Sequence, residues 1–264
     1  MVNKILIWLG SRGLSVFSAI SSWIVKVNNP KDIPIIINNR NRYVFLKKLI
    51  DSLETRGYKN IIIIVNNSSY EPLIEYYKTL PYPIIWSKEN LGYMALSKLD
   101  LYKKVRKSFF VYTDSDVVPI DECPEDFMAY FLAVLKRNFW VSKVGFSLKI
   151  DDLPDFYDKK DNVIDWEKQF YNKTIGKNYI APIDTTFALH KPYAFISAKG
   201  IFKMIRTSFP YEARHMPWYN DSNNLTDEEK FYIESVEIGT HWSKGLDLGH
   251  VNFITRNFKK LLKK

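Results

Sequence analysis

From Lys31 onward, short apolar runs alternate along the chain with longer segments in which apolar residues recur at helical spacing. Short β-branched runs bounded by polar clusters are typical of buried strands, and the longer segments are typical of helices. The predicted strands of the first half are 33–38, 60–66, 83–86 and 108–113. The predicted helices are 42–56, 71–80, 93 to about 107, and 120–138. This alternation predicts an α/β fold with a mainly parallel sheet flanked by helices.

The second half is less regular. Its predicted elements are a strand at 140–149, a polar loop with short helical turns at 151–176, a strand at 183–190, a helix at 197–207, and a helix from the capping box at 226–229 to about 236. Neither an internal repeat nor a Gly/Ser/Pro-rich linker interrupts the chain. The pattern therefore predicts a single domain over 31–252.

Both ends of the chain carry amphipathic patterns. Residues 1–30 are predicted to hold an N-terminal amphipathic helix, and residues 253–264 form a basic amphipathic tail. Such segments can lie on anionic bilayers, or they can pack on the domain and leave a solvated lysine tail, and both interpretations stay open. No stretch reaches the roughly 18 apolar residues that span a bilayer.

The net charge of +9 changes this picture by predicting an anionic partner, such as a nucleotide diphosphate or an acidic membrane surface. Nucleic acid is not expected, since no nucleic-acid-binding motif is present and the basic residues are scattered except at the C-terminus. The single cysteine, Cys123, excludes internal disulfides and suits a reducing compartment. The expected location is cytoplasmic, with peripheral association at the inner face of a membrane as an open addition.

Polar residues follow each predicted strand of the first half. These segments are Asn-Asn-Arg at 38–40, Asn-Asn-Ser-Ser at 66–69, Glu-Asn-Leu-Gly at 89–92 and Asp-Ser-Asp at 114–116. Each one alone is ordinary turn chemistry. Because ligands of parallel α/β sheets bind beyond the carboxyl ends of the strands, the four segments together predict one polar rim above the sheet.

The strongest of these segments is Asp114-Ser115-Asp116, in which an apolar strand delivers two carboxylates into a turn. Magnesium and manganese prefer hard oxygen ligands, usually one or two carboxylates completed by phosphate oxygens and water. A solvated turn is the alternative interpretation. The position at a strand end favours a site for Mn²⁺ or Mg²⁺ on Asp114 and Asp116, where the ion would neutralise a diphosphate leaving group.

The segment from Ile33 to Pro119 resembles the nucleotide-binding half of a glycosyltransferase-A fold, most like family-2 glycosyltransferases. Residues 35–40 resemble their first strand and its Thr-Tyr-Asn-Arg-type ending, and residues 65–69 resemble their Val-Asp-Asn-x-Ser. Residues 89–93 match their Asn-Leu-Gly turn, and residues 113–116 match the Asp-x-Asp element. The order and spacing of the four motifs agree over roughly a third of the chain, whereas the resemblance in the C-terminal half is weak.

The resemblance implies an enzyme that moves a sugar from a UDP- or GDP-sugar to a hydroxyl of a saccharide or lipid-linked acceptor. Residues 31–120 would be the nucleotide-binding half and residues 121–252 the acceptor half. The residues that it assigns to the donor are Asn38, Asn39, Asn66, Asn90, Gly92, Asp114 and Ser115. Asn66 stands where the family usually has Asp, and because an amide both accepts and donates, GDP or another base stays open beside UDP.

Inverting members of such families take the acceptor proton with a carboxylate base. The candidates in this chain are Asp227, Glu228, Asp221 and Asp184. The acidic residues of the capping box can instead serve only to cap and charge their helix. If no candidate faces the leaving phosphate, a retaining reaction stays open.

A histidine of the C-terminal half often binds the metal or the diphosphate in these enzymes. His241 is the first choice for this role and His215 the second, while His190 and His250 are expected to satisfy local hydrogen bonds.

Two other classes of protein share parts of this pattern. A nucleotidyltransferase of sugar phosphates should carry a glycine-rich loop after the first strand, and residues 38–42 contain no glycine. A non-catalytic sugar-binding protein on the same fold is expected to have lost the metal carboxylates, which are present. The chain also lacks the phosphate loop, dinucleotide-binding and nucleophile-elbow motifs of P-loop, nicotinamide and α/β-hydrolase enzymes.

Overall fold

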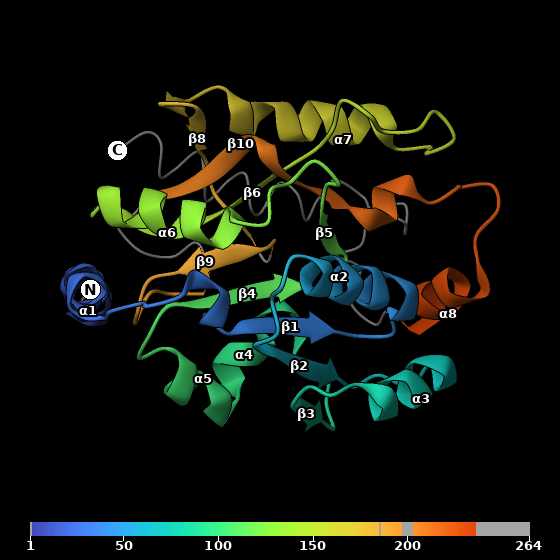
Figure 1. Cartoon of the computed structure of the whole chain (residues 1–264), viewed down its shortest axis with the longest axis horizontal. Coiled ribbons are helices and arrows are strands. Elements are labelled where there is room, and N and C mark those ends of the chain that lie inside the picture. The colour runs from blue at the N-terminus through green and yellow to red at the C-terminus, as the bar shows by residue number, and fades with distance from the viewer. Residues whose placement is uncertain (1, 185, 197–202, 236–264) are drawn as a thin grey trace.

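The computed structural model describes residues 2–184, 186–196 and 203–235, with side chains from residue 13 onward. Within these ranges one mixed sheet of ten strands runs through the molecule, and helices flank it on both faces (Figure 1). Most of the paired residues belong to parallel ladders. The predicted α/β class with a mainly parallel, helix-flanked sheet is therefore confirmed.

The first half of the sheet is entirely parallel, in the order β3-β2-β1-β4. Its strands are β1 (Ile35–Asn39), β2 (Ile61–Asn66), β3 (Ile84–Ser87) and β4 (Phe110–Asp114). Its helices are α2 (Tyr43–Thr55), α3 (Glu71–Thr79), α4 (Ala95–Lys98) and α5 (Asp100–Val105). Each predicted element is present, with two differences. The helix predicted from 93 is broken in two at Leu99, whose backbone is extended, and the helix predicted at 120–138 begins only at Phe127.

The second half adds antiparallel strands, and the order continues β4-β9-β6-β10-β8-β7, with β5 paired to β10. The strands are β5 (Val117–Pro119), β6 (Val141–Leu148), β7 (Thr174–Ile175), β8 (Asn178–Ile180), β9 (Ala188–His190) and β10 (Lys203–His215). The helices are α6 (Phe127–Arg137), α7 (Lys160–Glu167) and α8 (Asp227–Ser235). Only β6 and β10 pair in parallel here. The predicted strand at 183–190 is thus reduced to the three residues of β9, and the predicted loop at 151–176 contains α7.

The predicted helix at 197–207 is wrong where the structure describes it, because residues from Lys203 onward belong to the long strand β10. Residues 197–202 lie outside the described residues. Arg206, in this strand, is 4% exposed and forms an ion pair with Glu167 at 2.7 Å, so the strand carries a buried charge within its apolar pattern.

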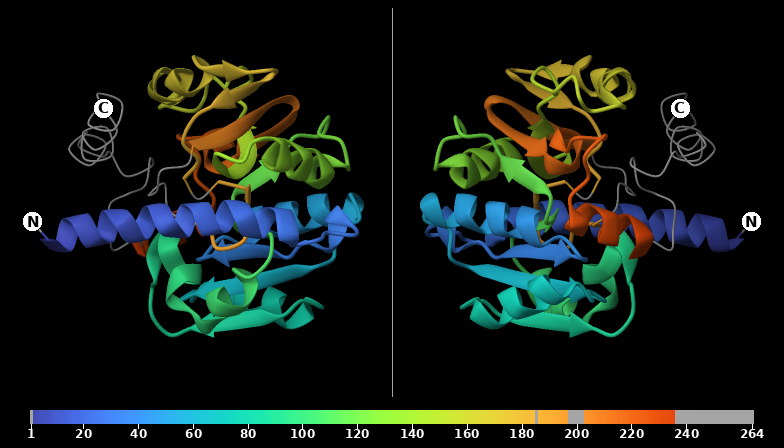
Figure 2. Two further views of the ribbon diagram at one scale, coloured as in Figure 1. Left: turned by 90° about the vertical axis from the view of Figure 1, so that its left-hand side faces the viewer. Right: turned by 90° about the vertical axis from the view of Figure 1, so that its right-hand side faces the viewer.

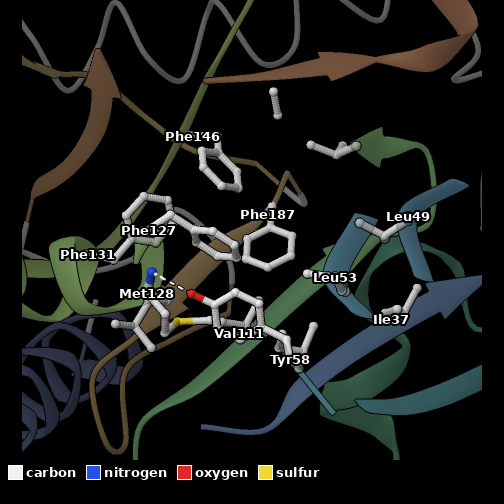
Figure 3. Close-up of a cluster of buried hydrophobic side chains, with 14 of the residues drawn as sticks. Ile37, Leu49, Leu53, Tyr58, Val111, Phe127, Met128, Phe131, Phe146 and Phe187 are labelled. Atoms are coloured by element: carbon white, nitrogen blue, oxygen red, sulfur yellow. Dashed lines mark hydrogen bonds between the residues drawn. The ribbon is translucent and has the colours of Figure 1, made fainter. Parts of the chain in front are cut away.

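The main core lies between the sheet and helices α2 and α6. Four phenylalanines pack there with ring centroids 4.8–5.8 Å apart (Figure 3). The Tyr58 hydroxyl accepts a hydrogen bond from the Met128 N–H at 3.2 Å and donates to the Glu125 carbonyl at 2.7 Å. Helices α4 and α5 cover the opposite face of β1, β2 and β4. The parallel half of the sheet is thus buried on both faces, which is why its strands are continuous apolar runs.

The predicted N-terminal helix is present as α1 (Val2–Ile24), which lies across the amino ends of the parallel strands (Figure 2). None of the helices in the described part of the chain is both long and apolar enough to cross a bilayer. The predicted tail at 253–264 lies outside the described residues.

Two lysines are buried in the second half of the sheet. The Lys143 ammonium donates to the carbonyls of Asp184 and Ile196 at 3.1 and 3.0 Å, and that of Lys191 donates to the carbonyls of Asn138 and Phe139. Burial lowers the pKa of each to about 8. Since an unfolded lysine keeps its proton to about pH 10.4, the unfolded chain binds more protons than the folded one between these values.

We therefore expect these two lysines each to add up to about 1.4 kcal/mol per pH unit to the slope of the free energy of unfolding between about pH 8 and 10, against an opposite contribution from Cys123 and the buried tyrosines, whose pKa values burial raises. Lys143→Met should remove one lysine's share of this slope, whereas the exposed Lys107→Met should leave it unchanged. Urea unfolding of the three proteins between about pH 7.5 and 9.5 measures the slope. Equal slopes for wild type and Lys143→Met would contradict the assignment.

Candidate functional site

The turn Asp114-Ser115-Asp116 joins β4 to β5 at the carboxyl end of the parallel strands. The register of β1 on β4 sets Asn38 beside Asp114, and the Asn38 amide donates to the Asp114 carboxylate at 3.3 Å. The Asp116 side chain is 17% exposed, so its carboxylate is largely enclosed yet reachable. Strand pairing therefore brings the Asp114 carboxylate and the Asn38 amide together at the rim, and Asp116 follows in the same turn.

Ser115 and Asn39 hold this turn from inside the protein. The Ser115 hydroxyl donates to the Asn39 side-chain oxygen at 2.6 Å, and the Asn39 amide donates to the Tyr77 hydroxyl at 2.8 Å. Asn39 is fully buried and Ser115 is 3% exposed. Both side chains therefore stabilise the aspartate turn through hydrogen bonds on its buried side.

Asn66 connects the end of β2 to the loop after β3. Its side-chain oxygen accepts from the Leu91 N–H at 2.7 Å, and its amide donates to the Gly92 carbonyl at 3.2 Å. A carboxylate at this position could accept the first bond but could not donate the second. The bond to Gly92 is thus a local structural reason for an amide at this strand end.

The loop that Asn66 binds is also stabilised by a hydrogen bond of its own. The Asn90 side chain accepts from the Gly92 N–H at 3.0 Å, and Gly92 has a φ of +68°. This left-handed conformation favours glycine, and a side chain at Gly92 would meet nothing within 4 Å. Backbone conformation is therefore what requires glycine at this place.

His215, at the end of β10, lies against the aspartate turn. The Met216 N–H donates to the Asp116 carbonyl at 2.8 Å, and the His215 Nε2 is 3.8 Å from an Asp116 carboxylate oxygen. Burial lowers the pKa of His215, and the Asp116 carboxylate acts in the opposite direction. A neutral imidazole beside a carboxylate is a suitable pair of donors for a divalent cation.

Helix α8 covers the same rim. Its Glu229 forms an ion pair with Arg42, which follows β1, and both side chains are nearly inaccessible at 4% and 3% exposure. The Arg42 guanidinium also stacks on the Tyr232 ring, 3.4 Å from its centroid. Burial raises the pKa of Tyr232, the Arg42 guanidinium lowers it, and the carboxylates of Asp116 and Asp114 raise it, so this phenol lies within the electrostatic field of the aspartates.

Asn41 links three elements at this edge and was not predicted to matter. Its side-chain oxygen accepts from the N–H groups of Ser69 and Tyr70 at 2.8 and 3.2 Å, and its amide donates to the Ser235 hydroxyl at 3.1 Å. Its φ is +52°. An asparagine directly after a strand is a recognised signal for this conformation, and it could have identified Asn41 in the sequence.

The three predicted base candidates around α8 have different surroundings. The Glu228 carboxylate is buried and accepts from the Val44 N–H at 3.0 Å, at the start of α2, and burial raises its pKa. The Asp227 side chain is 96% exposed and lies 3.6 Å from Lys230. The Asp221 carboxylate accepts from the Asn223 N–H at 2.8 Å within its own turn. The Thr226 half of the predicted capping box is present, since the Glu229 N–H donates to the Thr226 hydroxyl at 3.3 Å, whereas the Glu229 carboxylate accepts from Arg42 and Asn220.

The fourth candidate, Asp184, does not join this group. Its carbonyl accepts from Lys143, which pairs through β9 with Phe110 at the beginning of β4. Asp114 is the last residue of that strand. The structure therefore places Asp184 toward the amino ends of the parallel strands, away from the aspartate turn.

The predicted metal ligands are only partly assembled by the described residues. In this part of the chain no three His, Cys, Asp or Glu side chains form a complete metal cluster. Asp116 with His215, and Asp114 two residues earlier in the same turn, nevertheless fit the type of site in which one or two carboxylates are completed by phosphate oxygens and water. His241 lies outside the described residues. His215, the second choice from sequence, is the histidine at the site. A sequence prediction that had made residues 203–215 one strand would have placed it there.

Comparisons with known proteins give distant structural likenesses only. No family model matches the sequence, and no curated protein sequence matches it. Among solved structures, glucosyl-3-phosphoglycerate synthase from Mycobacterium tuberculosis with Mn²⁺, UDP-glucose and phosphoglyceric acid is similar at 10% identity with a TM-score of 0.36. The same enzyme with Mn²⁺ and UDP-glucose is similar at 11% identity with a TM-score of 0.36. Each match covers 61% of this chain and 56% of the other, and at these scores the likeness carries no functional argument.

The buried Arg42–Glu229 pair gives a stability prediction. Glu229→Ala leaves the Arg42 charge buried without its partner, which is expected to lower the free energy of unfolding by about 3–5 kcal/mol. Asp227→Ala, two residues away on the same helix, removes only an exposed charge and should leave the denaturation midpoint nearly unchanged. Urea denaturation of both variants compares the two. A Glu229→Ala midpoint equal to that of Asp227→Ala would show that the pair does not hold α8.

Proposed function

We propose that this chain is a metal-dependent glycosyltransferase that uses a nucleotide-sugar donor. The observation that carries the proposal is the turn Asp114-Ser115-Asp116, at the carboxyl end of a buried parallel strand and supported from behind by Asn39. Ligands of parallel α/β sheets bind at this edge. The resemblance of residues 33–119 to family-2 glycosyltransferases gives the chemistry, and the assembled rim is consistent with it.

Asp116 and Asp114 are the proposed ligands of Mn²⁺ or Mg²⁺, with His215 as the nearest histidine. His241 keeps its predicted role as a further ligand. The ion, when bound, neutralises negative charge on the departing nucleoside diphosphate. The Asn38 amide, which donates to Asp114, orients that carboxylate.

The donor nucleotide is proposed to lie over the ends of β1 and β2. Asn38 and the loop at Asn90 and Gly92 are its proposed contacts, and Asn39 and Ser115 support them. Because Asn66 uses both ends of its amide within the protein, we assign it to positioning this loop. The absence of the family's Asp at this position therefore does not by itself select against UDP, and UDP- and GDP-sugars both remain candidate donors.

The acceptor is proposed to be a saccharide or lipid-linked saccharide hydroxyl that reaches the aspartate turn beside α8. Tyr232 is the proposed aromatic contact there, and the buried Trp218 supports His215, on which it packs with ring centroids 4.7 Å apart. A carboxylate takes the acceptor proton in an inverting reaction. Asp221, Asp227 and Glu228 are the proposed candidates, since Asp184 lies toward the other edge.

Calorimetric titration of UDP, GDP and CDP, with and without Mn²⁺, tests the donor site. One nucleotide should bind only with the metal, and Asp116→Ala should weaken its binding by about 10- to 100-fold. The matched control Asp165→Ala removes an exposed carboxylate on α7 and should bind as wild type does. If no nucleotide binds under any condition, the donor site is absent and a sugar-binding protein becomes the better interpretation.

The base is identified by sugar transfer from the nucleotide that binds. Among Asp221→Asn, Asp227→Asn and Glu228→Gln, one variant should lower kcat by about 10²- to 10⁴-fold with nucleotide affinity unchanged. Asp184→Asn is the control that should keep full activity. If none of the three lowers kcat, or if Asp184→Asn does, the assignment of the base to the α8 side of the site is wrong.

A further inference from the structure

Helix α1 is oriented in the opposite way to an ordinary surface helix. Four serines of its described part are buried: Ser15, Ser18, Ser21 and Ser22. Five large apolar side chains on the same helix are 50–74% exposed, and we name them the outer stripe: Val16, Phe17, Ile20, Trp23 and Ile24. A helix that packs on a core buries its apolar face instead. The outer stripe is therefore an apolar surface without a covering element in the described part of the chain.

The position of α1 is set by contacts with the domain. It lies beside β6, and one member of the outer stripe takes part, since the half-exposed Phe17 ring contacts the Tyr193 ring at 4.8 Å between centroids. The Arg106 guanidinium lies 5.2 Å from the centroid of the same tyrosine. In two views α1 runs across the end of the molecule opposite α3 and α8 (Figures 1 and 2).

Basic residues gather at the same end. Helix α5 and the turn after it precede β4, α6 precedes β6, and β10 begins there, because these strands share one direction. The exposed basic residues of these segments are Lys103, Lys104, Lys107, Lys136, Arg137 and Lys203. Lys26 follows α1 directly and is also exposed. Of the acidic residues at this end, Asp100 is paired with Lys103 at 2.7 Å, and Asp32 and Asp184 are exposed, so basic residues outnumber acidic ones beside the outer stripe.

This combination favours a lipid surface over a second copy of the chain. A stable protein interface buries about 800 Å² on each partner, more than five side chains of one helix provide. Two copies meeting here would also bring their basic flanks together, whereas anionic lipids attract each nearby Lys or Arg by about 1 kcal/mol. Tryptophan is favoured at the headgroup level of bilayers, and Trp23, at 74% exposure, is the most exposed of the stripe.

We infer that the outer stripe of α1 and its basic flanks form a docking face for an anionic lipid bilayer. The helix lies in the plane of the headgroups, with its apolar side chains toward the acyl chains and its serines toward the protein. This inference concerns a different end of the molecule from the aspartate turn, and it holds or fails independently of glycosyl transfer.

Co-sedimentation of the full chain with vesicles tests the docking face. Vesicles of phosphatidylcholine with about 30% phosphatidylserine should bind the protein at least tenfold better than phosphatidylcholine alone, and added salt should weaken this binding. The triple variant Phe17→Ser, Ile20→Ser, Trp23→Ser should bind at least tenfold more weakly. The control Phe156→Ser, Phe209→Ser removes two aromatic side chains of similar exposure on other elements and should bind as wild type does.

A second readout does not depend on the triple variant folding. Lipids brominated on their acyl chains should quench tryptophan emission of the wild type, and Trp23→Phe should bind vesicles equally well but lose part of that quenching. Quenching that is equal in wild type and Trp23→Phe would overturn the inference. So would the absence of binding to the anionic vesicles at low salt.

Two further results would also overturn it. If deletion of residues 253–264 abolishes binding while the folded triple variant still binds, the tail and not α1 contacts the membrane. If the wild type is a dimer that does not bind vesicles, and the triple variant is a monomer, the outer stripe is a contact between copies of the chain.

Discussion

The shared direction of β1, β2, β3 and β4 is the constraint on which the rest of the site depends. Because the four strands run in parallel, their carboxyl ends meet at one edge, and the residues that follow them are brought together without any further device. The register then decides which side chains touch: Asn38 pairs with Asp114 and Asn66 with Ser87. A shift of one residue in β1 would move Asn38 to the other face of the sheet and Asn39 away from Ser115.

Polar side chains at this edge are divided between two tasks. Asn39, Asn41 and Asn66 use their amides to bind other parts of the protein, and each ties together segments far apart in the sequence. Asp114 and Asp116 are left nearer the surface. A rigid inner layer of amides that supports a reachable outer layer of carboxylates is a suitable arrangement for holding a cation, since ligands must be fixed before the ion binds.

The sequence predicted the first half of the fold and the aspartate turn well, because both depend on local patterns. Four apolar runs followed by Asn, Asp and Ser can be recognised one at a time. Strand β10 could not be predicted in this way, since the burial of Arg206 depends on Glu167, 39 positions away. The place of His215 beside Asp116 depends on β10, which the sequence did not predict.

The role of Glu229 shows the same limit. In the sequence it is one acidic residue of a capping box, and the Thr226 hydroxyl does cap its N–H. Its buried partner, Arg42, is 187 positions away in the chain. Local chemistry thus predicted that the helix exists and where it begins, while the non-local ion pair that fixes it over the aspartates could only be found in the structure.

Helix α1 and the aspartate turn lie at opposite ends of the molecule, and this limits how close the aspartates can come to a membrane bound at α1. The parallel strands separate the two ends, and with the loops and helices on either side that distance is on the order of 20–30 Å. A molecule lying on a bilayer through α1 holds its aspartates on the far side, facing the surrounding water. A hydroxyl close to the headgroups would be too near the membrane to meet them. The geometry therefore suits an acceptor that extends well away from the lipid, such as the free end of a growing chain, or one that diffuses in solution.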